Sequence, residues 1–208
     1  MTNLSSADIQ GPVGNTYDKY GTRNPLARVL VRRFLVEMDA AIAQVGPSRV
    51  LDVGCGEGVV TERIARLLPD ADVVGLDVDD PDLLEDWKGR AGRNLSFATG
   101  SAYSLPYGDD EFELVCAVEV LEHLARPASA LTELARVSSR ALILTVPREP
   151  LWRVANVLSG RYLRDLGNTP GHVNHWSSGR FLRLVGSVGT ITRVRRPFPW
   201  ILVALHTY

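Results

Sequence analysis

The feature that most constrains the fold is a regular alternation of short apolar runs with helical segments. The runs are almost continuously apolar, so each would be buried on both faces if it formed a strand. Strands of this kind separated by helices predict βαβ units and a parallel sheet covered on both sides. We expect strands at 49–53, 72–78, 95–100, 112–118 and 141–146, and helices at 59–68 and 127–137.

Both ends of the chain extend this pattern. An apolar stripe at helical spacing predicts a further helix over 25–45. Near the other end, helical stretches at about 150–158 and 177–186 precede two strand-like runs, TITRVRR and WILVALH, with only RPFP between them. A connection that short joins antiparallel strands.

We therefore predict one α/β domain over 1–208. Its centre is a doubly wound, Rossmann-like sheet of seven strands, mostly parallel with an antiparallel C-terminal hairpin. The chain divides into an irregular N-terminal arm (1–24), a core (25–147) and a C-terminal part (148–208).

The composition is that of an ordinary globular domain. Apolar residues make up 45% of the 208 residues and charged residues 23%, which argues against wholesale disorder. The two cysteines form no C-x-x-C pair, so a zinc ribbon is excluded. No apolar run is long enough to span a bilayer, and the first ten residues do not resemble a signal peptide. We expect a cytoplasmic protein.

Charge is divided unevenly along the chain. The formal net charge of −1 gives no general attraction to nucleic acid. From Arg148 to Tyr208, nine arginines stand against two acidic residues, so this part carries +7 and the first 147 residues carry −8. An ordinary solvated face explains such arginines. The alternative is that the C-terminal part faces an anionic acceptor or an acidic membrane surface.

The segment LDVGCGEG (51–58) leads from the first core strand into a helix and holds three alternate glycines. Glycine permits sharp turns with positive φ and the close approach of a ligand. In a doubly wound sheet, such a loop is where a nucleotide-like ligand binds. A dinucleotide site prefers G-x-G-x-x-G, whereas here the third glycine comes one place early and Val59 takes its position.

Carboxylates beside this loop indicate the chemistry of the ligand. Asp52 and Glu57 are unfavourable near a pyrophosphate but suit a cation. Asp77 ends the second strand, from where a carboxylate can accept hydrogen bonds from ribose hydroxyls. A ligand with adenosine at one end and a positive charge at the other fits both facts, and S-adenosyl-L-methionine is such a ligand.

From about Arg49 to Pro147, the chain resembles the class I S-adenosylmethionine-dependent methyltransferases, in the branch that acts mostly on small molecules. LDVGCGEG is similar to the first motif of the family and GLDVD to its second. FATGSAYSLPYGDDEFELV, VEVLEHLARPASALTELARV and LILTVP are similar to the segments into the fourth strand, after it and through the fifth. The five motifs stand in the order and spacing of the family.

This resemblance implies that 25–147 binds the cofactor and that 148–208 forms an acceptor-site insert and the hairpin. The cofactor-binding residues it implies are Tyr17, Asp52, Gly54, Cys55, Gly56, Gly58, Asp77, Val78, Ser101, Ala102, Val118 and Glu119. Asp52 and the glycines would line the methionine end, Asp77 would hold the ribose, and 78 and 101–102 would border adenine. Ser101 stands where the family often has Asp, and a hydroxyl is a weaker acceptor. Tyr17 would cap the cofactor, unless it only packs on the surface.

Glu119, Glu122 and His123 form an E-x-x-E-H pattern after the fourth predicted strand. If a helical turn starts there, all three lie on one face. Some methyltransferases use this pattern with a further histidine to hold a divalent ion, and His172 or His175 would complete the set here. We do not favour a metal, because many relatives carry the pair without one.

His123, His172 and His175 are our candidate catalytic residues. They are three of the four histidines, and imidazole is the side chain best suited to take a proton near neutral pH. For each of them, a structural hydrogen-bonding role is the alternative.

The predicted function is methyl transfer to a small-molecule acceptor, with oxygen favoured as the nucleophile and nitrogen or carbon second. An anionic or lipid-linked acceptor and peripheral contact with a membrane surface would explain the arginines; we expect no nucleic-acid partner. One alternative is a non-catalytic S-adenosylmethionine-binding sensor or scaffold. A nicotinamide-dependent oxidoreductase is less favoured, because of the displaced glycine and because the chain has no Tyr-x-x-x-Lys pair.

Overall fold

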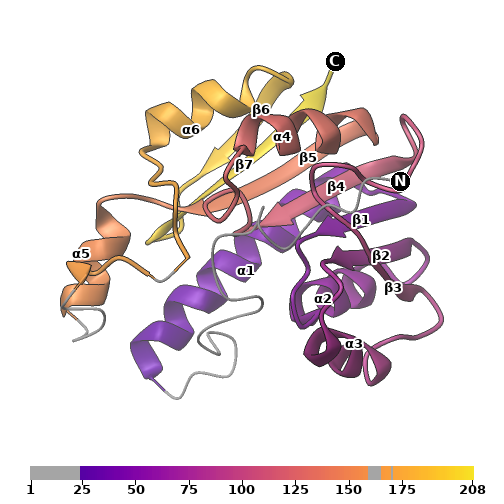
Figure 1. Cartoon of the computed structure of the whole chain (residues 1–208), viewed down its shortest axis with the longest axis horizontal. Coiled ribbons are helices and arrows are strands. Elements are labelled where there is room, and N and C mark those ends of the chain that lie inside the picture. The colour runs from indigo at the N-terminus through magenta and orange to yellow at the C-terminus, as the bar shows by residue number, and fades with distance from the viewer. Residues whose placement is uncertain (1–23, 159–164, 170) are drawn as a thin grey trace.

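Seven strands form one continuous sheet in the computed structural model, which describes residues 24–158, 165–169 and 171–208 (Figure 1). Their order across the sheet is β3-β2-β1-β4-β5-β7-β6. The strands are β1 (Arg49–Val53), β2 (Asp72–Asp77), β3 (Leu95–Thr99), β4 (Phe112–Val118), β5 (Ser138–Pro147), β6 (Gly189–Arg195) and β7 (Trp200–Thr207).

The first five strands are parallel and the last two are not. β1 pairs in parallel with β2 and with β4, and β3 and β5 continue the parallel ladder on either side. β7 runs antiparallel to both β5 and β6. The strand order reverses beside β1, because β2 lies on one side of it and β4 on the other. The carboxyl ends of β1 and β4 therefore form a topological switch point, which is where α/β sheets bind ligands.

Helices cover both faces of the sheet. The helices are α1 (Pro25–Val45), α2 (Val59–Leu67), α3 (Pro81–Lys88), α4 (Pro127–Arg136), α5 (Leu151–Leu158) and α6 (Ser178–Val185). Buried residues of α1 and α2 belong to one hydrophobic cluster, and those of α4 and α6 belong to the other. Within the described residues, no helix is both long enough and apolar enough to cross a membrane.

β5 shows why the central strands are apolar without interruption. Ala141 and Ile143 belong to the cluster on the α1 side, whereas Leu142 and Leu144 belong to the cluster on the α4 side. All four are buried, since successive side chains of a strand point to opposite faces and both faces are covered here.

The structure confirms the predicted α/β class, the seven-stranded sheet and the antiparallel C-terminal pair. The helix over 25–45 has the predicted bounds, and most other elements lie within one or two residues of theirs. Two features differ. β5 begins at Ser138, because the strand continues through a bulge opposite Phe112. The sequence pattern also did not predict α3, although Asp80 caps it and Pro81 stands at its start.

Candidate functional site

The loop between β1 and α2 passes through the left-handed region at three glycines. The φ angle is +73° at Gly54, +54° at Gly56 and +79° at Gly58, and side chains rarely adopt these values. A Cβ at Gly54 would lie 2.5 Å from Val120, and one at Gly58 would lie 2.7 Å from the Phe97 ring. Nothing lies within 4 Å of such a Cβ at Gly56. The loop therefore packs tightly at both ends and leaves open space at its middle.

Hydrogen bonds to the end of β2 hold the loop in place. The amides of Gly54 and Cys55 donate to the Leu76 carbonyl at 2.7 and 3.1 Å, and the amide of Gly56 donates to the Asp77 carboxylate at 2.7 Å. The other oxygen of Asp77 accepts from the next amide along the chain at 2.7 Å. Burial raises the pKa of Asp77, and the two amide bonds oppose that shift. Asp77 thus lies beside the loop, as the sequence predicts.

Asp52 lies in β1, the strand that leads into the glycine loop, and its carboxyl group is buried. Its Oδ2 accepts a hydrogen bond from the Thr61 hydroxyl at 2.7 Å, whereas Oδ1 has no hydrogen-bond partner among the described residues. Burial raises the pKa of Asp52 to about 7; the Thr61 bond opposes this rise and the charge of Asp77 adds to it. An ionised carboxyl is costly in such a place unless a positive charge lies nearby.

Trp87 of α3 supports the glycine loop from the side. Its indole N–H donates to the Gly56 carbonyl at 2.8 Å. The indole also stacks on Phe97, with ring centroids 5.1 Å apart and planes 8° from parallel. Phe97 in turn fills the space left by Gly58 and Gly75, where a Cβ would lie 2.7 and 2.6 Å from the ring. The sequence analysis missed this contact because it missed α3, whose Asp80-Pro81 start was the available signal.

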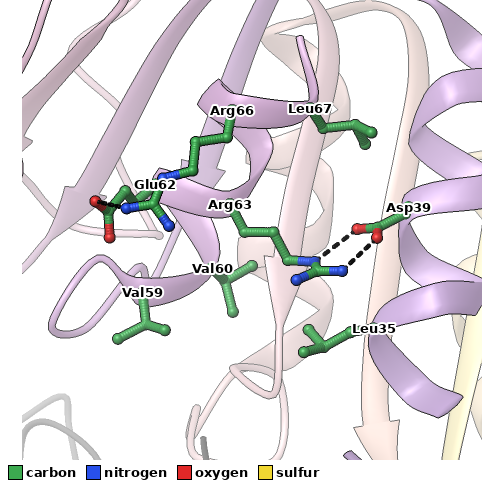
Figure 2. A pocket seen from close by; sticks show the side chains of 8 residues that line it. All are labelled: Leu35, Asp39, Val59, Val60, Glu62, Arg63, Arg66 and Leu67. Atoms are coloured by element: carbon green, nitrogen blue, oxygen red, sulfur yellow. Dashed lines mark hydrogen bonds and ion pairs between the residues drawn. The ribbon is translucent and has the colours of Figure 1, made fainter. Parts of the chain in front are cut away.

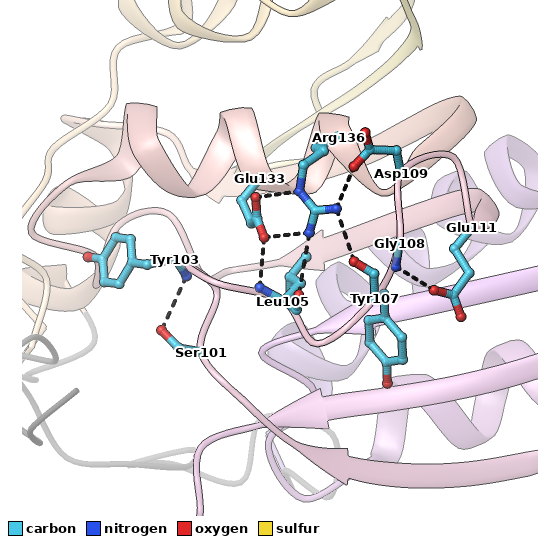
Figure 3. A network of polar contacts seen from close by, with 9 residues as sticks. All are labelled: Ser101, Tyr103, Leu105, Tyr107, Gly108, Asp109, Glu111, Glu133 and Arg136. Carbon is cyan, nitrogen blue, oxygen red and sulfur yellow. Dashed lines mark hydrogen bonds and ion pairs between the residues drawn. The ribbon is translucent and has the colours of Figure 1, made fainter. Parts of the chain in front are cut away.

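The loop that follows β3 is anchored by α4, as Figure 3 shows. The Ser101 hydroxyl accepts from the Tyr103 amide at 3.2 Å, and the Leu105 amide donates to the Glu133 carboxylate at 2.8 Å. Glu133 also binds the Arg136 guanidinium at 2.6 and 2.8 Å, and this hydrogen bonding lowers the pKa of Glu133. The loop that carries residues 101–102, which are predicted to border adenine, is thus hydrogen-bonded to α4.

The smaller predicted cofactor contacts lie around the same end of the sheet. Val78 directly follows β2, Ala102 packs against the cluster on the α4 side, and Val118 ends β4. Cys55 has a free, partly buried thiol. Burial, and then the nearby carboxylates, raise the pKa of the Cys55 thiol, which makes it a poor nucleophile.

After β4 the chain turns sharply, and the helix considered for the E-x-x-E-H pattern does not form. Glu119 takes φ +58°, and the amide of His123 donates to the Val120 carbonyl at 2.9 Å. Glu122 and His123 come together with His172 instead: their potential ligand atoms lie within 4.8 Å of one another. We call these three residues the 122–123–172 cluster. In the described part of the chain, the group does not include Glu119.

Residues 171–174 of the C-terminal part are hydrogen-bonded to this turn. The amides of Val173 and Asn174 both donate to the Glu122 carbonyl at 3.0 Å. The Asn174 side chain donates to the carbonyls of the flanking residues 121 and 124 at 3.2 and 2.7 Å. His123 Nδ1 lies 3.0 Å from the Gly171 carbonyl. Because a carbonyl only accepts, Nδ1 carries the proton and the neutral ring has its acceptor at Nε2.

An aromatic series connects this cluster to the helices around it. The ring centroids of His123 and His172 lie 4.9 Å apart, and the ring centroid of Trp152 of α5 lies 6.2 Å from that of His172. The Trp200 ring of β7 packs against Trp152, with centroids 5.7 Å apart, and against Phe34 of α1, with centroids 5.0 Å apart. His172 is only 8% exposed.

One predicted catalytic residue does not join the cluster. His175 is exposed, and its Nε2 bonds to the Asn168 side chain at 2.7 Å. The predicted cofactor residue Tyr17 lies outside the described residues.

A separate pocket of about 330 Å³ lies between α1 and α2, as Figure 2 shows. Arg63 of α2 donates to both carboxylate oxygens of Asp39 of α1, at 2.5 and 2.9 Å. The residues that line the pocket are Leu35, Asp39, Val59, Val60, Glu62, Arg63, Arg66 and Leu67. None of them is a predicted cofactor or catalytic residue.

Comparison with known proteins agrees with this geometry. A family model described as a methyltransferase domain matches residues 51–141, from the glycine loop through α4 to the start of β5. Over this part, the chain is similar to that methyltransferase family.

Curated proteins that are similar to this chain include enzymes named for quinone biosynthesis. The demethylmenaquinone methyltransferase of Roseiflexus castenholzii is 32% identical over 122 residues, which are 55% of this chain and 51% of that one. The ubiquinone biosynthesis O-methyltransferase of Ruegeria sp. is 32% identical over 107 residues, 49% of this chain and 42% of that one. The chain thus matches about half the length of these relatives.

A solved structure has the same fold over nearly the whole chain. The magnesium protoporphyrin IX methyltransferase of Synechocystis, solved with bound SAH, gives a TM-score of 0.69 at 19% identity and covers 92% of this chain and 94% of its own. At this identity, the likeness shows a shared fold.

The raised pKa of Asp52 leads to a testable pH dependence of cofactor binding. Because the folded pKa is about 7, the carboxyl loses its proton between about pH 6 and about pH 8, and the charged form attracts a sulfonium. We expect the affinity for S-adenosyl-L-methionine, measured by calorimetry, to rise about three- to tenfold over this range. Asp52→Asn should remove the rise and weaken binding, whereas Asp70→Asn on the exposed surface should behave like wild type. A rise that survives in Asp52→Asn would assign the titration to another group.

The Trp87 contact can be tested with a substitution that keeps its stacking. Trp87→Phe retains an aromatic ring against Phe97 but loses the hydrogen bond to Gly56. We expect cofactor affinity to fall about five- to tenfold, which corresponds to the loss of one hydrogen bond. Trp176→Phe is the matched control, because the Trp176 indole N–H has no hydrogen-bond partner among the described residues. Equal affinities for the two variants would contradict a role of Trp87 in holding the loop.

Proposed function

We propose that this chain transfers a methyl group from S-adenosyl-L-methionine to a small-molecule acceptor. The observation that carries the proposal is the surroundings of the glycine loop. Asp52 places a buried carboxyl beside it, with one oxygen lacking a hydrogen-bond partner among the described residues, and Gly56 leaves the middle of the loop open. This combination suits a cation and disfavours a pyrophosphate.

The predicted contacts would divide the cofactor among three elements. Asp52 and the glycine loop would face the methionine end, with residues 118–119 at the end of β4 close by. Asp77 would accept from the ribose hydroxyls, which would then compete with the Gly56 amide for the same carboxylate. Val78 and residues 101–102 would border adenine. Tyr17 stays a prediction that lies outside the described residues.

The residues of the 122–123–172 cluster suit proton transfer at the acceptor. When bound, S-adenosyl-L-methionine supplies a methyl group on a positively charged sulfur, ready for in-line displacement. The protein then has to align the acceptor, exclude water and, for a hydroxyl, take a proton. We assign the proton to His123 or His172, whose rings lie 4.9 Å apart next to the end of β4. His175 is the weaker candidate, because it is exposed and bonded to Asn168.

A divalent metal at the same three residues is the second candidate for this cluster. One carboxylate and two imidazoles within 4.8 Å are a donor set that a zinc- or manganese-like ion accepts. We favour proton transfer, because the Nδ1 bond of His123 to the Gly171 carbonyl already prepares Nε2 as a proton acceptor. Activity that is lost with a chelator and restored by one ion would favour the metal.

For the acceptor, we propose an oxygen nucleophile on an anionic or lipid-linked small molecule. The name of the Ruegeria relative contains O-methyltransferase and ubiquinone biosynthesis, which supports both parts of this proposal. The nine arginines of 148–208 would favour an anionic group. We also retain the prediction of a cytoplasmic location.

The decisive experiment is calorimetry of the full chain with S-adenosyl-L-methionine and, separately, with NAD. Binding of the first alone is the expected result, and tight binding of NAD alone would overturn the proposal in favour of an oxidoreductase. A screen of candidate acceptors with mass detection should then find a product one methylene heavier than its substrate. A chain that binds the cofactor but methylates nothing would be a sensor or scaffold.

Catalysis by the histidines makes a specific prediction once an acceptor is known. His123→Gln and His172→Gln should each lower kcat by about a hundredfold or more and remove the acidic limb of the pH–rate profile. Cofactor affinity, measured by calorimetry, should stay within about twofold of wild type, because neither residue belongs to the predicted cofactor contacts. His206→Gln, on the exposed side of β7, is the matched control. Loss of cofactor binding in both variants would instead indicate a structural role.

A further inference from the structure

The outer face of α1 carries exposed aliphatic side chains at helical spacing. Leu26, Val29 and Val36 are 67%, 50% and 54% exposed. Their spacing of three and seven residues places them along one side of the helix, with Arg33 between the last two. Aliphatic residues that repeat along one exposed helix face indicate a surface that contacts something.

Exposed arginines surround these aliphatic residues. Arg28, Arg32 and Arg33 are exposed, and within the part of the chain that the structure describes none of them forms an ion pair. The first acidic residue of α1 is Glu37, which pairs with Arg195. The first three turns of α1 therefore carry only positive charge.

The neighbouring helix α5 continues this surface. Val154 and Val157 are 50% and 41% exposed, and α5 contains no acidic residue. The two helices are joined beneath by Trp200, which contacts Phe34 of α1 at 5.0 Å and Trp152 of α5 at 5.7 Å. Figure 1 shows α5 and the first turns of α1 at the same end of the molecule.

We infer that this surface docks on an anionic lipid surface. Its members, which we call the α1–α5 face, are Leu26, Arg28, Val29, Arg32, Arg33, Val36, Val154 and Val157. Exposed aliphatic side chains can enter the boundary of the acyl chains while the guanidinium groups bind lipid phosphates. Positive charge that has no ion-pair partner within the described ranges is complementary to such a surface, whereas a second copy of the same face would meet like charge.

Docking in this way would bring the predicted catalytic cluster close to the lipid. Trp152 stacks on His172 with ring centroids 6.2 Å apart, so helix α5, which carries part of the α1–α5 face, also contacts the 122–123–172 cluster. The inference deepens the proposed function and rests on it in one respect: a lipid-linked acceptor would reach the cluster from the membrane. Binding to vesicles itself needs no cofactor and no acceptor.

The test is flotation of the full chain with vesicles of phosphatidylcholine alone and with about 30% phosphatidylglycerol. We expect binding only to the anionic vesicles, and weaker binding as salt is raised. The variant Arg28→Gln/Arg32→Gln/Arg33→Gln should bind at least tenfold more weakly, and so should Leu26→Ser/Val29→Ser. The control Leu84→Ser/Lys88→Gln on α3 should match wild type, because Leu84 and Lys88 are also exposed but lie outside the face.

Thermal melting and calorimetry with S-adenosyl-L-methionine should be unchanged in every variant, which separates docking from folding and from the proposed function. Equal binding of wild type to both kinds of vesicle, or no binding, would overturn the inference. So would wild-type binding by the triple arginine variant. A dimer that Leu26→Ser/Val29→Ser converts to a monomer, seen by sedimentation, would assign the face to a second copy of the chain.

Discussion

The loop at 54–58 depends on a backbone path that only glycine follows without strain, and the rest of the site depends on that loop. Gly54 and Gly58 take left-handed φ angles at points where a side chain would also collide with Val120 or Phe97. The path is then fixed by Leu76, which accepts two of its amides. Because these partners belong to β2, β3 and the turn after β4, the loop has its shape only when the sheet has formed.

The central sheet was predictable because its strands carry a strong signal. Strands such as β5, buried on both faces by two helical layers, must be apolar at every position, so their limits can be read from the sequence. The short RPFP connection likewise predicted that β7 runs antiparallel to β6. α3 was less visible because only Leu83 and Trp87 of its eight residues are buried, so its apolar stripe is short. Its capping residues carried more information than its hydrophobic pattern.

The surroundings of the glycine loop were more predictable from the sequence than the 122–123–172 cluster was. Asp52, Asp77 and the glycines lie close together because the carboxyl ends of parallel strands lie at the same edge of the sheet. The sequence shows where these strands end. The contact of Trp87 with Gly56 joins residues 31 positions apart through a side chain, which no local pattern records. The approach of His172 to Glu122 likewise brings together residues that lie far apart in the sequence. The left-handed backbone at Glu119 was not predicted either, since a glutamate rarely adopts it.

The hydrogen bonds between residues 171–174 and the turn at 121–124 limit how the acceptor-binding part can be redesigned. Both main-chain and side-chain groups hold the two segments together, so a chimera that exchanges the C-terminal part must carry Gly171 and Asn174 along with His172. Trp152 of α5 stacks on His172, so α5 borders the cluster as well. Libraries that seek a new acceptor should therefore keep Trp152 and vary the exposed positions of α5, such as Val154 and Val157.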